Sequence, residues 1–292
     1  MNSRIKQMVC LLVAVPLLAL GSTAAKGKIV LTPSQGSMGV GVKVPSLLGQ
    51  EFSLFLPKTI GCYEMTMVNQ TATGMQWKSA EEEGAFICEW SSSGLIYYSI
   101  KLIPYDDYVD MVFMVRNFTR LTWSDVWFFT LLAPQGDASA FRDEQMLRTY
   151  MQVGGKPMLL SDTDRETDRR PEIMFYLHES IPENHPPHFV EGFQQTSTTR
   201  PDGNWMISVS KRNNAWIGTV SANPVFLFNN SGLSSLHVAP GFGDIGPGEK
   251  SEIVSRVYFS RGNLKQAIKR IEAELPELAS RAKQAPNKRS LR

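Results

Sequence analysis

The chain has 292 residues, of which 42% are hydrophobic and 20% are charged. This composition is that of a folded globular protein, and it excludes a chain that is mainly disordered, collagen-like or coiled-coil. The 30 Lys and Arg residues nearly balance the 28 Asp and Glu residues. The chain as a whole therefore has no charge that would attract nucleic acid, and we expect no nucleic-acid partner.

The first 25 residues have the three parts of a secretory signal peptide. Arg4 and Lys6 precede the apolar run Met8–Leu20, and small residues follow up to Ala25. The apolar run is shorter than the roughly 20 residues that a membrane-spanning helix needs. We predict that residues 1–25 are removed, that no membrane span is left, and that the protein is secreted or periplasmic.

Two cysteines remain after the leader, because Cys10 lies inside it. Cys62 and Cys88 lie in strand-like segments of a chain that we expect to be exported, so a disulfide between them is permitted. Such a bridge would stabilise the fold by roughly 3 kcal/mol. The alternative is a pair of buried free thiols, since cysteine is among the most buried residue types.

Residues 26–262 are predicted to form one all-β domain, a large antiparallel β-sandwich. Segments rich in β-branched and aromatic residues alternate with clusters of Gly, Pro, Asn and Asp, and no helical crossover separates them. This pattern favours antiparallel sheets packed face to face. The expected strands are Gly39–Val44, Glu51–Leu56, Gly61–Val68, Ala85–Trp90, Leu95–Ile103, Tyr108–Asn117, Val126–Ala133, Leu147–Val153, Ile173–His178, Trp205–Ser210, Ala215–Val220, Val225–Phe228 and Glu252–Phe259.

The pattern changes to that of a helix over residues 263–280. Asn263 is a suitable N-cap, and apolar residues recur at spacings of three and four from Leu264 to Leu278. We expect this helix to pack on the sandwich and Pro276 to end or kink it near Leu275. Residues 281–292 are basic and contain no acidic residue, so they are predicted to be a disordered tail.

Three of the four histidines lie between His178 and His188, and neutral imidazoles are common metal ligands. The prolines among them predict an irregular loop, and the helical His-Glu-x-x-His spacing is absent. We expect a polar surface loop there, with no metal and no cofactor. The chain also lacks the Gly-x-Ser-x-Gly, phosphate-loop and Cys-x-x-Cys motifs, so serine hydrolases, kinases and thioredoxin-like proteins are excluded.

Trp205 and Trp216 flank a predicted hairpin turn and are candidates for stacking on the apolar C–H faces of sugar rings. The alternative for these tryptophans is the hydrophobic core, where large aromatic side chains are usually buried.

Five short motifs between Leu102 and Phe259 occur in the same order as in a known protein family. In chain order the motifs are Leu102-Ile103-Pro104-Tyr105-Asp106-Asp107-Tyr108-Val109-Asp110-Met111, Trp123-Ser124-Asp125-Val126, Arg148-Thr149-Tyr150, His237-Val238-Ala239-Pro240-Gly241-Phe242-Gly243-Asp244-Ile245-Gly246-Pro247-Gly248-Glu249 and Arg256-Val257-Tyr258-Phe259. Over about residues 74–262 the chain resembles exported bacterial proteins that look like the galactose mutarotase-like β-supersandwich.

The resemblance implies a supersandwich fold and carbohydrate as a partner. Mutarotases of that fold use a glutamate base and a histidine acid in a sugar cleft on the concave sheet, and His237 is the histidine that lies in a matching motif. The resemblance therefore makes His237 the candidate catalytic residue. Arg148 and Arg256 belong to the same motif series and are the candidate polar contacts to the sugar.

We predict a secreted carbohydrate-binding protein whose aromatic-lined cleft contains Trp205, Trp216, Arg148 and Arg256. One alternative is a mutarotase-like or polysaccharide-active enzyme with His237 as acid or base. Another is an interaction module of the cell envelope with no small ligand. The sequence leaves open whether the protein is an enzyme, which saccharide it takes and how many copies assemble.

Overall fold

A computed structural model describes residues 27–68, 75–164, 172–184, 187 and 197–283. The predicted leader, residues 1–25, and residues 284–292 of the predicted tail lie outside the described residues. His185 and His188 of the histidine-rich loop also lie outside them.

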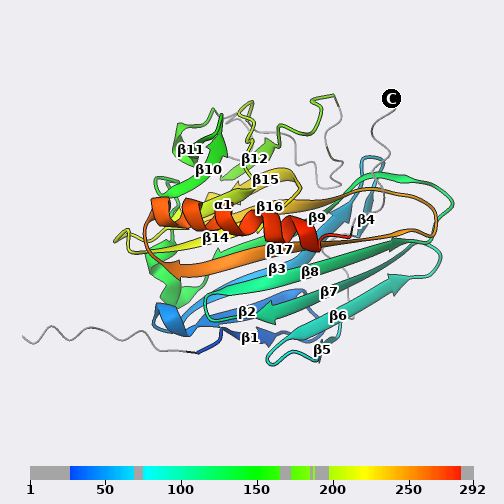
Figure 1. Ribbon diagram of the computed structural model, residues 1–292, viewed down its shortest axis with the longest axis horizontal. Helices are drawn as coiled ribbons and strands as arrows, with labels where there is room; N and C mark the ends of the chain where they lie inside the picture. The colour runs from blue at the N-terminus through cyan, green and yellow to red at the C-terminus, as the bar shows by residue number, and fades with distance from the viewer. Residues whose placement is uncertain (1–26, 69–74, 165–171, 185–186, 188–196, 284–292) are drawn as a thin grey trace, which may run out of the picture.

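Two antiparallel sheets face each other, which confirms the predicted all-β sandwich (Figure 1). In spatial order, sheet A consists of β1 (Val30–Pro33), β2 (Gly39–Val44), β3 (Gln50–Gly61), β9 (Trp123–Pro134), β16 (Ser235–Ile245), β15 (Pro224–Asn230) and β12 (Ile173–Leu177), with β4 (Thr66–Val68) paired to β3. Sheet B consists of β11 (Lys156–Leu159), β10 (Thr149–Val153), β13 (Trp205–Val209), β14 (Ala215–Ser221), β17 (Lys250–Arg261), β8 (Tyr108–Asn117), β7 (Ile96–Pro104), β6 (Phe86–Ser92) and β5 (Trp77–Ser79).

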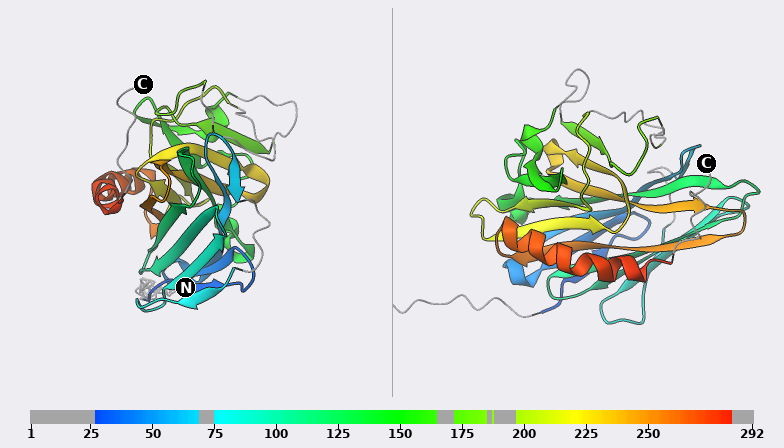
Figure 2. Two further views of the ribbon diagram at one scale, coloured as in Figure 1. Left: turned by 90° about the vertical axis from the view of Figure 1, so that its right-hand side faces the viewer. Right: turned by 45° about the horizontal axis from the view of Figure 1, so that its top comes forward.

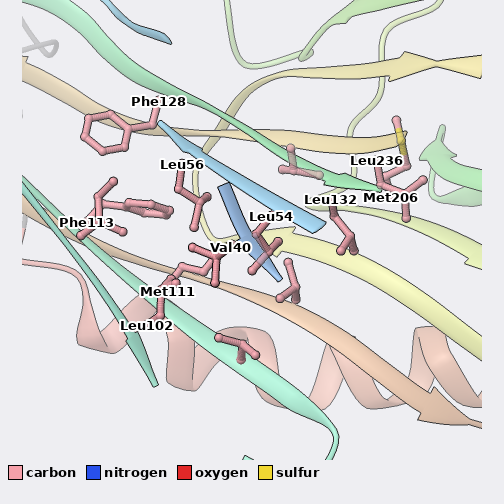
Figure 3. Packing of buried hydrophobic residues seen from close by; sticks show 14 of the residues in the cluster. Val40, Leu54, Leu56, Leu102, Met111, Phe113, Phe128, Leu132, Met206 and Leu236 are labelled. Carbon is pink, nitrogen blue, oxygen red and sulfur yellow. The ribbon is translucent and has the colours of Figure 1, made fainter. Parts of the chain in front are cut away.

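The main hydrophobic core lies between the two sheets (Figure 3). Alternate residues of each strand point into it: Leu54 and Phe128 come from sheet A, and Leu102 and Phe113 come from sheet B. A strand that is apolar at every second position buries those residues on one face because side chains alternate across a strand. Each such side chain contributes roughly 1.5–3 kcal/mol when it is fully buried.

One central strand of sheet A was not expected from the sequence. β16 lies between β9 and β15, although its Pro and Gly residues predict a turn. The glycines are accommodated because the register with β9 shifts between Gly241 and Gly243 and again before Ile245. Sequence analysis also missed the short strands β1, β5 and β11.

A single α-helix, α1 (Leu264–Arg281), covers part of the outer face of sheet B within the described residues (Figures 1 and 2). The Asn263 side chain accepts a hydrogen bond from the Gln266 backbone, and the Gln266 side chain accepts one from the Asn263 backbone. This capping box starts the helix where the sequence predicted. Ala267, Ile271 and Leu278 are buried in an apolar cluster with residues of sheet B.

α1 ends at Arg281, next to the predicted limit at residue 280, and Pro276 does not end it near Leu275. The last turn is held by tertiary contacts: Leu278 is buried, and Arg281 donates a hydrogen bond of 2.6 Å to Asp110. The predicted tail therefore begins with an ordered residue. Lys283 follows in a backbone bridge to Glu252 of β17.

A buried ion cluster joins α1 to sheet B. Asp110 of β8 has no exposed surface, and its carboxylate accepts hydrogen bonds from Arg256 of β17 at 2.6 Å and from Arg281. Arg256 also donates to Glu274 of α1 at 2.6 Å, and its guanidinium lies 4.1 Å from the ring centre of Tyr108. Burial disfavours the Arg256 charge, but the hydrogen bond and the charge of Asp110, together with Tyr258, outweigh it and raise the pKa of Arg256.

Apart from α1 the described residues form strands, short 3-10 turns and loops. In this part of the chain no helix has the length and apolar character needed to cross a membrane.

Replacing Asp110 with Asn should destabilise the protein strongly. The variant removes the fully buried carboxylate that Arg256 and Arg281 share and leaves Arg256 only the partly exposed Glu274 and Glu277, and removing one partner of a buried pair costs about 3–5 kcal/mol. Urea unfolding followed by circular dichroism measures the loss. The control is Glu83→Gln, which breaks an exposed pair with Lys28 at 2.8 Å and should leave the unfolding midpoint unchanged. Equal midpoints for Asp110→Asn and the wild type would contradict the role given to the ion cluster.

Candidate functional site

His237 lies in the middle of the outer face of sheet A, on β16. It is 1% exposed and is surrounded by aromatic side chains. Its ring stacks on Phe129, with ring centres 4.7 Å apart and an interplanar angle of 16°, and meets the edge of Phe228 at 4.8 Å. Phe129 belongs to β9 and Phe228 to β15, so the two neighbouring strands hold the imidazole on either side.

Only one of the two ring nitrogens of His237 makes a well-formed hydrogen bond. Nε2 lies 2.7 Å from Ser235 Oγ, which itself accepts a hydrogen bond from the Asn230 backbone. Nδ1 is buried and makes no hydrogen bond of good geometry, although the backbone of Thr130 lies close enough to the imidazole to raise its pKa. An unsatisfied buried polar atom costs about 1–3 kcal/mol, so its presence in a well-packed face calls for an explanation.

The imidazole is neutral at pH 7. Burial is the main reason that the pKa of His237 lies well below its ordinary value, and the positive charge of Lys58 lowers it further. The Lys58 ammonium lies 5.4 Å from the ring centre of Phe129, so this cation is close to the same group of side chains.

The strand register places His237 in a straight row of residues across sheet A. Gly39 of β2 pairs with Phe55 of β3, and Phe55 pairs with Leu131 of β9. Leu236 pairs with Leu132 and Gly241 with Trp127, and this register sets His237 opposite Leu131. The row then continues through Phe228.

A second row runs beside the first and consists of small and polar residues. Thr32 of β1 pairs with Gly41, Gly41 pairs with Ser53, and Ser53 pairs with Ala133. By the register of β9 and β16, Ala133 faces Ser235, the hydrogen-bond partner of His237. Side chains in the two rows point to the same face because they are two residues apart along each strand.

The outer face of sheet A thus has two halves. The half over β9, β16, β15 and β12 is buried and contains what we call the aromatic cluster: Trp127, Phe129, Phe175, Phe226 and Phe228. The Trp127 ring lies so close to Gly61 that a Cβ there would be 2.3 Å from it, so this position requires glycine. The half over β1, β2 and β3 is partly or fully exposed and contains what we call the open strip: Thr32, Gly39, Gly41, Ser53 and Phe55.

The structure places the predicted tryptophans elsewhere. Trp205 and Trp216 are buried in the apolar cluster beneath α1, on the outer face of sheet B. The apolar stripe of α1 needs an apolar surface to pack on, and these two rings provide it. The alternative prediction, that these tryptophans are buried among other apolar side chains, describes their surroundings. They do not line an open surface.

The two predicted arginines are also separated from His237. Arg256 is buried in the ion cluster with Asp110. Arg148 donates hydrogen bonds of 3.0 Å to the backbone carbonyls of Ala140 and Val209, so it holds together the chain around the start of β10. The fold uses these two arginines to hold other parts of the chain together, and neither lies beside His237.

Cys62 and Cys88 are free thiols in the structure, so the predicted disulfide is not formed. Cys62 directly follows β3 of sheet A and Cys88 lies in β6 of sheet B, and both are buried in the main core. Burial raises the pKa of Cys62 to about 12 and that of Cys88 to about 11. Both side chains are therefore neutral, and they act as small apolar residues, as the alternative prediction held.

The acid–base pair of the enzyme hypothesis is not formed among the described residues. There the ring of His237 hydrogen-bonds to Ser235, and no carboxylate hydrogen-bonds to it. Glu249 lies in the turn before β17 and accepts a hydrogen bond from the Gly246 backbone at 2.9 Å. Among these same residues, no group of three His, Cys, Asp or Glu side chains is arranged to hold a metal ion.

The chain matches no protein-family model and no curated protein. Among solved structures it is similar to a galactose mutarotase-like protein from Lactobacillus casei, with 10% identity, a TM-score of 0.41, and coverage of 80% of this chain and 100% of that one. A galactose mutarotase related enzyme from Lactobacillus acidophilus has 9% identity, a TM-score of 0.35, and coverage of 81% and 98%. The GalM/aldose epimerase homologue from C. elegans has 9% identity, a TM-score of 0.39, and coverage of 82% and 100%.

The weak resemblance predicted from the motifs is therefore found again among solved structures. At these identities and TM-scores it describes the general architecture, and we transfer no site residue or activity from it.

Two features of the outer face of sheet A escaped the sequence analysis. The aromatic cluster was missed because its residues come from strands far apart in the chain. Phe55 carried a usable signal: Phe52, Leu54 and Leu56 alternate as core residues, which sets Phe55 on the opposite face.

Acid should destabilise the protein partly through His237. Burial lowers the pKa of His237, and also that of His178, below the value of about 6.5 expected in the unfolded chain. The unfolded chain therefore takes up protons first, and stability falls as the pH drops below about 6.5, by up to about 1.4 kcal/mol per pH unit for each histidine.

Urea unfolding of the wild type and of His237→Phe at pH 7.5 and pH 5 measures this contribution. The loss of stability between the two pH values should be smaller in His237→Phe, while the effects of all other groups cancel in the comparison. An identical loss in both proteins would show that His237 titrates normally in the folded state.

Proposed function

We propose that this protein binds carbohydrate on the outer face of sheet A, with His237 as the polar contact. The observation that supports the proposal is the buried Nδ1 of His237, which makes no well-formed hydrogen bond although the Thr130 backbone is nearby and aromatic rings surround it. Polar atoms kept unsatisfied inside a packed structure are expected where function demands them.

The chemistry of this face suits a sugar. A pyranose ring has apolar C–H faces, which stack on flat aromatic rings, and hydroxyl groups, which need hydrogen-bond partners. The aromatic cluster provides the rings, and His237 provides a nitrogen for one hydroxyl. Because the imidazole is neutral, its hydrogen bond to a neutral hydroxyl requires no desolvation of a charge.

His237 is 1% exposed, so a sugar reaches its ring only when the side chains that cover it move. The Phe129 ring is stacked on the imidazole, so a sugar that reaches Nδ1 takes the place of this ring. Displacing the fully buried Phe129 ring costs roughly 1.5–3 kcal/mol, which the stacking and hydrogen bond of the sugar must offset. The open strip lies in the same rows of the sheet and provides the solvent-exposed approach.

We propose binding without acid–base chemistry, because no carboxylate among the described residues hydrogen-bonds to His237. We further propose that the protein works outside the cytoplasm, in the secreted or periplasmic state that the leader sequence predicts.

A thermal-shift screen of the purified protein against glucose, galactose, mannose and their β-1,4-linked trisaccharides tests the proposal. A ligand present at about a hundred times its Kd adds about 2.7 kcal/mol to the stability of the folded state, so a binding saccharide should raise the Tm. No rise with any of these sugars would overturn the proposed function.

His237→Phe should keep the packing of the face and weaken the binding of the saccharide found in the screen by about tenfold, since one hydrogen bond contributes about 0.5–1.5 kcal/mol. Isothermal titration calorimetry measures the affinity. The matched control is Trp216→Phe, which changes an aromatic residue on the outer face of the other sheet and should bind as the wild type does. Wild-type affinity in His237→Phe, or a loss confined to Trp216→Phe, would move the site away from His237.

A further inference from the structure

We propose that the open strip is a second subsite centred on Phe55, so that the ligand is an oligosaccharide and not a single sugar. This inference rests on the proposed function and extends it along the face of sheet A.

Phe55 is the accessible aromatic ring of this face. Its side chain is 38% exposed, whereas every member of the aromatic cluster is buried. On one side it borders Gly39, where a Cβ would be 3.5 Å from the Phe55 ring, so no side chain of β2 stands beside it at this row. Within the described residues no cation and no second ring stacks on Phe55, and its exposed surface is available to a flat apolar partner.

Exposure alone does not make a phenylalanine suitable for stacking on a sugar, as Phe118 illustrates. Phe118 is 43% exposed, but the guanidinium of Arg116 lies 5.2 Å from its ring centre and occupies that ring. It also lies just beyond the end of β8, in the loop toward β9, and not on the face that holds His237.

Polar groups suited to sugar hydroxyls surround Phe55. Thr32 and Ser53 belong to the neighbouring row, on either side of Gly41, and place hydroxyl groups on the same face. One row further along, Lys43 and Glu51 form an exposed pair at 3.7 Å. An aromatic ring bordered by hydroxyls and mobile charged side chains is the combination that a pyranose ring requires, one apolar face and several hydrogen-bonding edges.

The distance between the two subsites sets the length of the ligand. Phe55 lies on β3 and His237 on β16, with only β9 between them. Neighbouring strands are about 4.8 Å apart, so the two positions are separated by about 10 Å across the sheet, more than one pyranose ring spans. Leu131 and Ala133 of β9 lie between them and are almost fully buried, so a ligand that contacts both positions requires the side chains that cover this part of the face to move.

Calorimetric titration of glucose, galactose and mannose, each against its β-1,4-linked trisaccharide, tests the second subsite. In the wild type the trisaccharide should bind about tenfold more tightly than the matching monosaccharide, since one aromatic stacking contact contributes about that factor. In Phe55→Ala the trisaccharide should lose this advantage and bind like the monosaccharide, while monosaccharide affinity stays unchanged.

Phe118→Ala is the matched control, because it removes an equally exposed phenylalanine and should leave both affinities unchanged. A Tm close to that of the wild type verifies that each variant is folded. Equal affinities of mono- and trisaccharide in the wild type, or a full trisaccharide advantage in Phe55→Ala, would overturn the second subsite while the site at His237 stands. If neither ligand binds the wild type, the proposed function itself fails.

Discussion

A carboxylate with no exposed surface, Asp110, determines how the outer face of sheet B is organised. A buried charge is tolerated only when it is paired, and Asp110 takes one partner from β17, Arg256, and a second, Arg281, from the last turn of α1. The helix is therefore tied to the sheet at the position where its apolar stripe meets Trp205 and Trp216. With this face covered, the outer face of sheet A is the remaining broad sheet surface that carries both aromatic rings and a buried, unsatisfied polar atom.

That second face is divided by the same alternation that builds the core. On β9, β16, β15 and β12 the outward residues are aromatic and buried, and His237 sits among them as a neutral group. On β1, β2 and β3 most outward residues are small or polar, the exceptions including Val30 and Phe55, and solvent reaches both of these. The buried aromatic cluster and the exposed open strip lie in the same rows of the sheet. A ligand that contacts both therefore extends across several strands.

Much of the fold could be predicted because it depends on local patterns. The strand β2 has the predicted limits, β8 does too, and the N-cap at Asn263 starts α1 as expected. The site was less accessible: the motif around His237 was identified, but its strand was not, since Pro240, Gly241 and Gly243 predict a turn and are accommodated here by shifts in the register between β16 and β9. Arg148 and Arg256 have the residue type of sugar ligands, yet backbone carbonyls and Asp110 are their partners.

The sequence by itself determined the all-β class, the alternation that separates core from surface, and the presence and start of the C-terminal helix, because each of these follows from residues within a few positions of one another. Only the tertiary structure decided that α1 extends past Pro276, that the two cysteines stay apart as thiols, and that Phe55, Leu131 and His237 form one row. These outcomes depend on the pairing of strands that are distant in the chain, and an antiparallel register joins residues whose separation leaves no local trace in the sequence.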